Sequence, residues 1–312
     1  MYLKPDLLVL LLQVVILIRD ICNVGSFMLY LTNRILKISI LHPENDLQYL
    51  GSRYCRGGYI WQIDSVEHGP LFSGPKFPDS HPPVFDGQGI PDVFETAIGS
   101  AVSNVGESVH VIGVGDVLRS SETTPFHVRW NPIVVAPCQW QIVVNSDFIE
   151  MSTSAEFKGY RYYLTKRVVL EGSGCTLMAN IYNTGILPIP VRWFVHPFFP
   201  LNNGNVSCHL SLPLTIPDNP GFKNCDNHLS MVHSFDWKMG CYRTTSVPWN
   251  KPVSISIKHS LVKDITMKTS YGLSWLPVWA NENAFSIEPF FSKFLIPHES
   301  VEWNVTFTFS KL

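Results

Sequence analysis

The placement of prolines and glycines constrains the fold of this chain more than any other feature of its sequence. There are 23 prolines and 20 glycines, and from residue 33 onward they divide the chain into short apolar runs that seldom show the 3.6-residue period of a helix. Strands are predicted at residues 35–41, 59–66, 126–135, 139–147, 160–170, 188–198, 206–214, 252–260, 284–291 and 301–309. The pattern predicts an all-β fold, a large antiparallel β-sandwich that forms a single domain over residues 31–312.

The composition is sufficient for a large core, and it argues against a nucleic-acid partner and against a zinc site. Hydrophobic residues make up 46% of the chain and aromatic residues 12%, which suffices for an extensive core in 312 residues. The 23 basic and 25 acidic residues nearly balance, so there is no electrostatic signature of nucleic-acid binding. Seven scattered cysteines without a C-x-x-C pair argue against a zinc site. We expect neither a metal nor a cofactor.

Residues 1–30 form an N-terminal extension that differs from the rest of the chain. From Leu7 to Ile18 it is apolar (LLVLLLQVVILI), too short to span a bilayer but long enough for the apolar region of a signal peptide. The charge before it is balanced and no A-x-A-like site follows. A packed helix, a signal or anchor segment, and an artefactual start remain open interpretations. A cytoplasmic location is expected, with secretion or membrane anchoring through this segment as the alternatives.

A single histidine, His196, lies in the stretch from residue 182 to 199 (YNTGILPIPVRWFVHPFF). The Asn-Thr-Gly sequence favours a turn, and the prolines that follow exclude a helix, so the backbone is expected to be extended. Apolar and aromatic residues flank the imidazole on both sides. From this segment alone, a core histidine with one hydrogen bond is the more common interpretation than a catalytic group.

A second candidate, Glu288, is the only charged residue of the apolar run 284–291. Burial would raise the pKa of this carboxyl group toward neutrality and make it a usable general base. The structural alternative is a salt bridge to an arginine such as Arg53 or Arg161. Judged alone, the segment does not decide between the two.

Several short motifs together resemble the aldose 1-epimerase (galactose mutarotase) superfamily. They are N-T-G-x-x-P-I-P, H-P-F-F, S-I-E-P-F-F and P-H-E-S-V-E-W, in that order. Residues 160–170 are similar to the strand that precedes the histidine in that superfamily, and residues 50–58 lie where its first strands are set. Residues 87–95 (GQGIPDVFE) resemble the G-G-I-P segment of hexose-phosphate mutarotases and a G-x-G-x-x-x-E-F segment of epimerase-like proteins. The resemblance covers residues 33–312.

This resemblance implies a fold, an activity and a catalytic pair. The fold would be the galactose mutarotase-like supersandwich, and the partner a small-molecule sugar. Glu288 would remove the proton of the anomeric hydroxyl group while His196 protonates the ring oxygen. The ring opens, the C1–C2 bond rotates, and closure gives the other anomer without any metal.

Four further residues are candidate sugar-binding groups. The guanidinium groups of Arg53 and Arg56 could hold a carboxylate, a phosphate or a sugar hydroxyl, or could instead fasten loops. Glu95 could be a second carboxylate in the cleft or an ordinary charge at a strand end. Asp236 could accept hydrogen bonds from sugar hydroxyl groups.

Two departures from the family pattern bear on the substrate. Many sugar mutarotases have an additional active-site histidine, for which His110 and His127 are the candidates. Where hexose-phosphate members carry an arginine before G-G-I-P, this chain has Gly87, which argues against a phosphosugar. Trp193, Trp275 and Trp279 are possible stacking surfaces for a pyranose ring, although core positions are expected for at least two of them.

The fold itself would also suit other functions. A noncatalytic carbohydrate-binding module would keep the aromatic cleft and tolerate loss of Glu288. A glycoside hydrolase would need a second carboxylate, which only Glu95 or Asp236 could supply. Convergence of His196 and Glu288 in one pocket favours the epimerase, because side chains more than about 8 Å apart could not serve a single ring within hydrogen-bond reach. The oligomeric state is not indicated by the sequence.

Overall fold

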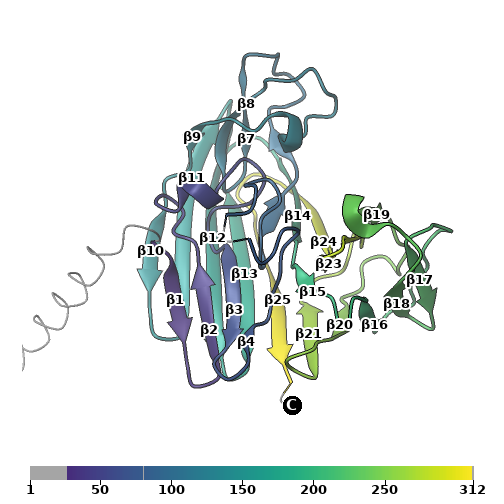
Figure 1. Cartoon of the computed structure of the whole chain (residues 1–312). Coiled ribbons are helices and arrows are strands. Elements are labelled where there is room, and N and C mark those ends of the chain that lie inside the picture. The colour runs from purple at the N-terminus through teal and green to yellow at the C-terminus, as the bar shows by residue number, and fades with distance from the viewer. Residues whose placement is uncertain (1–26, 80, 311–312) are drawn as a thin grey trace, which may run out of the picture.

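The protein is built almost entirely from antiparallel β-strands (Figure 1). The structure, a computed structural model, describes residues 27–79 and 81–310. The interpretations of the segment from Leu7 to Ile18 lie outside these residues. Within them no helix is long and apolar enough to cross a membrane, and the only helical turns are η2 (Leu47–Tyr49), η3 (Val128–Trp130) and η4 (Trp237–Met239). The predicted all-β fold class is confirmed.

The largest sheet contains ten strands. Their order is β10 (Gln141–Val144), β11 (Phe148–Phe157), β12 (Tyr160–Glu171), β13 (Gly174–Asn183), β25 (Ser300–Phe309), β21 (Asp264–Thr269), β20 (Ser254–Lys258), β16 (Ser207–Leu210), β18 (His228–Met231) and β17 (Phe222–Cys225). Alternate residues of its central strands are buried, which is the period-two pattern expected when one face of a sheet packs on a core.

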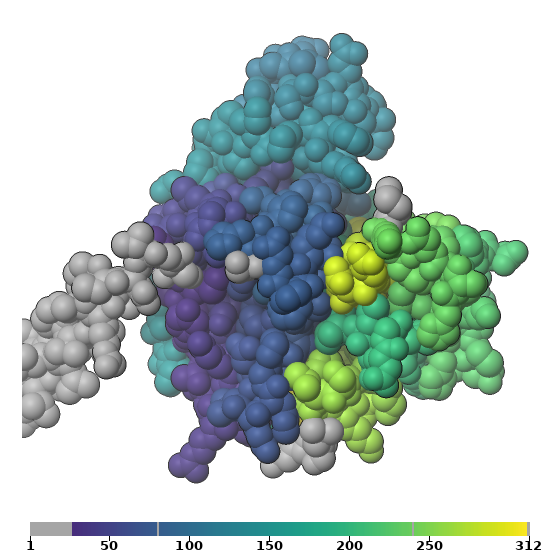
Figure 2. All heavy atoms as spheres, viewed as in Figure 1, coloured from purple at the N-terminus to yellow at the C-terminus, as the bar shows by residue number. Residues whose placement is uncertain are grey.

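Four smaller sheets complete the structure. One consists of β1 (Leu29–Thr32), β2 (Leu36–Ile40), β3 (Ile60–Ser65) and β4 (Gly69–Pro70), and another of β24 (Phe290–Leu295), β14 (Ile189–Val195) and β5 (Asp92–Phe94). The third is β15 (Phe199–Pro200), β23 (Ala284–Ile287), β22 (Val278–Ala280) and β19 (Cys241–Arg243), and the fourth is β6 (Ala97–Ile98), β7 (Ser108–Val111), β8 (Gly115–Leu118) and β9 (Val134–Pro137). Figure 2 shows the β6–β9 region as a lobe at the top and the β16–β19 region as a lobe at the right.

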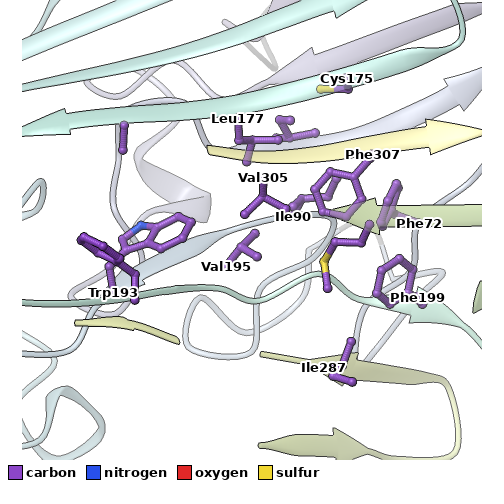
Figure 3. Close-up of a cluster of buried hydrophobic side chains, with 14 of the residues drawn as sticks. Phe72, Ile90, Cys175, Leu177, Trp193, Val195, Phe199, Ile287, Val305 and Phe307 are labelled. Atoms are coloured by element: carbon purple, nitrogen blue, oxygen red, sulfur yellow. The ribbon is translucent and has the colours of Figure 1, made fainter. Parts of the chain in front are cut away.

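The core lies between the large sheet and the smaller sheets that cover it. One continuous cluster of buried side chains runs from Leu31 to Phe309. Figure 3 shows Val305 and Phe307 of the large sheet close to Val195, at the end of β14. The single domain over residues 31–312 stays a proposal, which this continuous core supports.

The strand predictions differ from the structure in three ways. Most of the predicted runs contain a strand, but residues 126–135 form mainly a loop with η3, and β9 begins only at Val134. The ten-residue strands β11 and β13 were not predicted, and neither was the shorter β21. The run 284–291 is divided into β23 and β24 by Glu288 and Pro289, because proline lacks the N–H group that a continuous ladder requires.

Candidate active site

His196 and Glu288 lie next to one another, just beyond the paired part of two neighbouring strands. In the antiparallel pair of β14 and β24, Trp193 lies opposite Phe291 and Phe194 opposite Phe290. The pairing ends there, and His196 and Glu288 lie beyond it on the two chains. The His196 Nε2 atom lies 3.4 Å from Glu288 Oε1, so the two predicted groups converge in one place.

The backbone holds both residues just beyond the ends of their strands. The N–H group of His196 donates to the carbonyl oxygen of Pro91 at 2.8 Å, and that of Glu288 donates to Pro277 at 3.0 Å. Glu288 follows β23 and precedes β24, which belong to different sheets. The carboxyl group therefore stands where the chain passes from one sheet to the other, with its backbone fixed by a neighbouring loop.

Burial dominates the electrostatics of Glu288. Its side chain is 6% exposed, and removal from water raises the pKa of the carboxyl group from 4.5 to about 8, with a further contribution from the charge of Glu95 and an opposing one from Arg53. A carboxyl group with a pKa near neutrality can both accept and return a proton at physiological pH.

His196 is buried to a similar extent, and the effect on its pKa is opposite in direction. Loss of hydration, and secondarily the positive charge of Arg53, lower the pKa of the imidazole well below its ordinary value of 6.5. Its Nδ1 atom is buried without a hydrogen-bond partner among the described residues. Since the two pKa values lie on either side of neutrality, the His196–Glu288 pair holds a single proton around pH 7.

The pair faces a cavity of about 500 Å³ with aromatic walls. Phe198, Tyr242, Trp279 and Phe290 line it, and the ring of Phe198 lies 4.4 Å from that of His196 between centroids. Charged and titratable groups line it as well, and convergent polar groups among aromatic rings are typical of a small-molecule site. Aromatic faces suit the apolar face of a sugar ring.

Of the three tryptophans considered as stacking surfaces, only Trp279 lines this cavity. Trp275 lines an adjoining one. Trp193 is 1% exposed and belongs to the core.

Two of the four predicted sugar-binding residues line the cavity. Arg53 does so while it donates a hydrogen bond from Nη1 to the carbonyl oxygen of Phe85 at 2.8 Å. Glu95 also lines the cavity, but it is paired with Arg192, whose Nε atom lies 2.5 Å from Glu95 Oε2. Arg53 is thus free to meet a ligand with its other N–H groups, whereas Glu95 already has a cationic partner.

The structure corrects the other two assignments. Arg56 is 5% exposed and does not line the cavity; its backbone N–H group donates to Gly113, and burial lowers the pKa of its guanidinium group. Asp236 is exposed and also lies outside the cavity, because it caps η4 by accepting a hydrogen bond from the N–H group of Lys238 at 3.1 Å. Neither side chain is placed to bind a sugar beside His196.

Only one of the two candidate histidines lines the cavity. His110 is enclosed between Asp116 Oδ1 at 2.7 Å and the Tyr162 hydroxyl group at 2.8 Å, outside the cavity. His127 lines the cavity. It is therefore the only one of the two that could contact the same ligand as His196.

Tyr242 and Arg129 are among the cavity residues that the sequence does not single out. Tyr242 is on β19 opposite Trp279 of β22, and burial raises the pKa of its phenol, with a smaller contribution from Glu288. Arg129 lies in η3, inside a run predicted as a strand. The only sequence signal for Arg129 was a basic residue among aromatic ones (FHVRW), and Tyr242 had none.

Gly87 has a structural reason to lack a side chain. Its φ angle is +71°, and a Cβ atom there would lie 2.6 Å from the ring of Tyr54 and 2.8 Å from the hydroxyl oxygen of Tyr59. An arginine at this position would require both tyrosines to move. If the cavity binds an anion, the positive charge must come from elsewhere.

Known structures share this architecture at low sequence identity. A galactose mutarotase related enzyme from Lactobacillus acidophilus has a TM-score of 0.60 and 11% identity, covering 91% of this chain and 98% of that chain. A galactose mutarotase-like protein from Lactobacillus casei gives 0.56 and 11%, with 90% and 99% covered. An aldose epimerase homologue from C. elegans gives 0.50 and 10%, with 92% and 100% covered. No protein-family model and no curated protein matches the sequence. The chain therefore has the galactose mutarotase-like fold that its sequence motifs implied.

Proposed function

We propose that this protein interconverts the α and β anomers of a sugar by acid–base ring opening. The observation that carries the proposal is the His196–Glu288 pair, with 3.4 Å between its Nε2 and Oε1 atoms, buried at the wall of an aromatic cavity. The shared fold supports it but does not decide it, because one fold hosts many activities.

The geometry suits a reaction at a single carbon atom. The anomeric hydroxyl oxygen and the ring oxygen are both bonded to C1, so the groups that exchange protons with them must be neighbours. At pH 7 the shared proton rests on Glu288, and the reaction starts from the form of the pair in which this proton has passed to His196. In that form Glu288 accepts the proton of the anomeric hydroxyl group while His196 donates its proton to the ring oxygen, and the C1–O5 bond breaks to give the open aldehyde. After rotation about C1–C2 the transfers reverse, and the pair recovers its original proton count.

The direct test is an anomerisation screen with the purified full-length chain. Freshly dissolved α- or β-anomers of hexoses, pentoses, uronic acids and hexose 6-phosphates would be followed by ¹H NMR, with the buffer rate subtracted. We expect at least one sugar to equilibrate faster with enzyme than in buffer, in proportion to enzyme concentration. Equal rates with and without protein for all of them would refute the proposal.

The pH dependence of the rate should follow the single shared proton. Glu288 has a pKa of about 8 and His196 one well below 6.5, so the pair gains a second proton in acid and loses its only proton in alkali. We therefore expect kcat/KM to be bell-shaped, with its alkaline limb centred at about 8 and its acid limb below 6.5. Rates would be measured between pH 4 and 10 with the buffer-catalysed rate subtracted at each pH. A rate that rises steadily through pH 10 would contradict this assignment.

A further inference from the structure

The wall of the cavity contains two arginines that form no ion pair among the described residues. Arg53 and Arg129 both line the cavity. Among the residues that the structure describes, neither arginine forms an ion pair, whereas Arg161, Arg167 and Arg192 each do. Two arginines that remain unpaired at one cavity wall are available to an anionic ligand.

The two guanidinium groups are held around one aromatic ring. The Cζ atom of Arg53 lies 4.4 Å from the centre of the Phe85 ring, and that of Arg129 lies 5.6 Å from it. Arg129 also packs against Trp130. Stacking on a ring positions a guanidinium group while most of its N–H groups stay free to donate. Phe85 thus serves as a common support for both charges.

His127 adds a third donor beside these arginines. Its Nδ1 atom accepts a hydrogen bond from the backbone N–H group of Arg129 at 3.1 Å, so the neutral ring carries its proton on Nε2. Partial burial, followed by the charges of Arg53 and Arg129, lowers the pKa of this histidine. Arg53, His127 and Arg129 all line the same cavity, so one ligand could contact all three.

The negative groups that line the cavity do not cancel this charge. Glu95 is neutralised by Arg192. Glu288, with a pKa of about 8, is largely protonated at pH 7. Asp86 is the remaining carboxylate of the lining, which leaves an excess of positive charge from the two arginines.

There is also space for a group attached to the sugar ring. A second cavity of about 430 Å³ adjoins the first and shares Arg53, Glu95, His127 and Phe194 with it. Arg53 and His127 therefore stand where the two cavities meet, within reach of a substituent that projects from a ring held beside His196.

We propose that Arg53, Arg129 and His127 form an anion subsite, and that the substrate is a sugar bearing a carboxylate or phosphate group. The inference rests on the proposed anomerisation for its substrate, but the subsite is defined by binding and can be tested without turnover. The anion subsite requires no arginine at position 87, where Tyr54 and Tyr59 occupy the space that a side chain would need.

Binding of ring-locked analogues separates this inference from the activity. 1,5-Anhydroglucitol, its 6-phosphate and the corresponding 6-carboxylate cannot open, so calorimetric titration of the full chain reports binding alone. We expect at least one of the two anions to bind about tenfold more tightly than the neutral compound, the difference expected for charge-assisted hydrogen bonds. The preference between phosphate and carboxylate identifies the anionic group.

The variants Arg53→Gln and Arg129→Gln should each remove most of the preference for the anion and leave the affinity for the neutral compound within about threefold. Arg129 is exposed, so its replacement should not disturb folding. The matched control is Arg161→Gln, because Arg161 is an exposed arginine outside both cavities, paired with Glu156. Equal affinity for neutral and anionic compounds, or an anion preference that survives Arg129→Gln, would overturn the subsite even if the enzyme anomerises neutral sugars. Tight binding of the anion without any turnover would leave the subsite standing and refute only the activity.

Discussion

Replacing Glu288 by glutamine is expected to reduce the enzyme-dependent rate of anomerisation by about 10²–10⁴-fold, the usual contribution of a positioned general acid or base. Glutamine has nearly the same shape but cannot accept the proton of the anomeric hydroxyl group. His196→Asn should cause a loss of the same order, since the two residues exchange protons with neighbouring oxygens of one substrate. The rate would be measured by NMR at pH 7 with the substrate found in the screen.

Two controls make the Glu288→Gln result specific. Glu171→Gln changes an exposed carboxylate at the end of β12, outside the cavity, and should retain the full rate. Binding of the ring-locked analogues to Glu288→Gln should persist, because the cavity walls are unchanged. A variant that keeps the wild-type rate would remove Glu288 from the mechanism. A wild-type protein that binds these analogues but never accelerates anomerisation would instead be a carbohydrate-binding module.

The sequence singled out the two residues of the proposed catalytic pair, but it predicted the strands beside them less well. His196 and Glu288 were found because short motifs around them resemble a known family. Their close approach depends on the pairing of β14 with β24 and on the loop contacts of both backbones, which the sequence alone does not specify. The predicted strand 284–291 missed the break at Glu288, although Pro289 is visible in the sequence and proline ends a hydrogen-bonded ladder.

The missed elements have two physical causes. The strands β11 and β13 contain many small or polar residues (FIEMSTSAEF and GCTLMANIYN). Their sequences therefore show only a weak strand pattern, and their pairing within the large sheet supplies the rest of the preference for a strand. Arg129 and Tyr242 reach the cavity through contacts with distant segments, such as Phe85 for Arg129. Residue type was also misleading for Arg56, because arginine is seldom buried as deeply as it is here.

The sequence does not show that one lysine, Lys166, is buried in the core as part of an ion pair. Lys166 occupies an inward-facing position of β12 and is 2% exposed at its side chain. Its Nζ atom lies 2.5 Å from Oδ2 of the fully buried Asp92, which also accepts a hydrogen bond from Trp193 Nε1. The pair joins the large sheet to β5, and the preceding residue, Pro91, accepts the backbone hydrogen bond of His196. The ion pair is therefore connected to β14, the strand that precedes His196, through Trp193 and through the pairing of β14 with β5.

Lys166→Met is expected to destabilise the protein by about 3–5 kcal/mol, because it leaves the Asp92 carboxylate buried without its counter-charge. Chemical unfolding in urea at pH 7, followed by tryptophan fluorescence, would measure the loss. The matched control is Lys258→Met, which removes a half-exposed lysine paired with Asp264 and should cost no more than about 1 kcal/mol.

The double variant Lys166→Met with Asp92→Asn shows whether the uncompensated charge is the cause. It removes both charges and keeps an amide oxygen as acceptor for Trp193, so most of the lost stability should return. A double variant as unstable as Lys166→Met would instead attribute the loss to packing of the lysine chain against Gly58 and Trp193. Because Pro91, which accepts the backbone hydrogen bond of His196, is adjacent to Asp92, Lys166→Met should also lower the anomerisation rate, and the double variant should restore the rate together with the stability. Both effects would then follow from the placement of β5 against the large sheet.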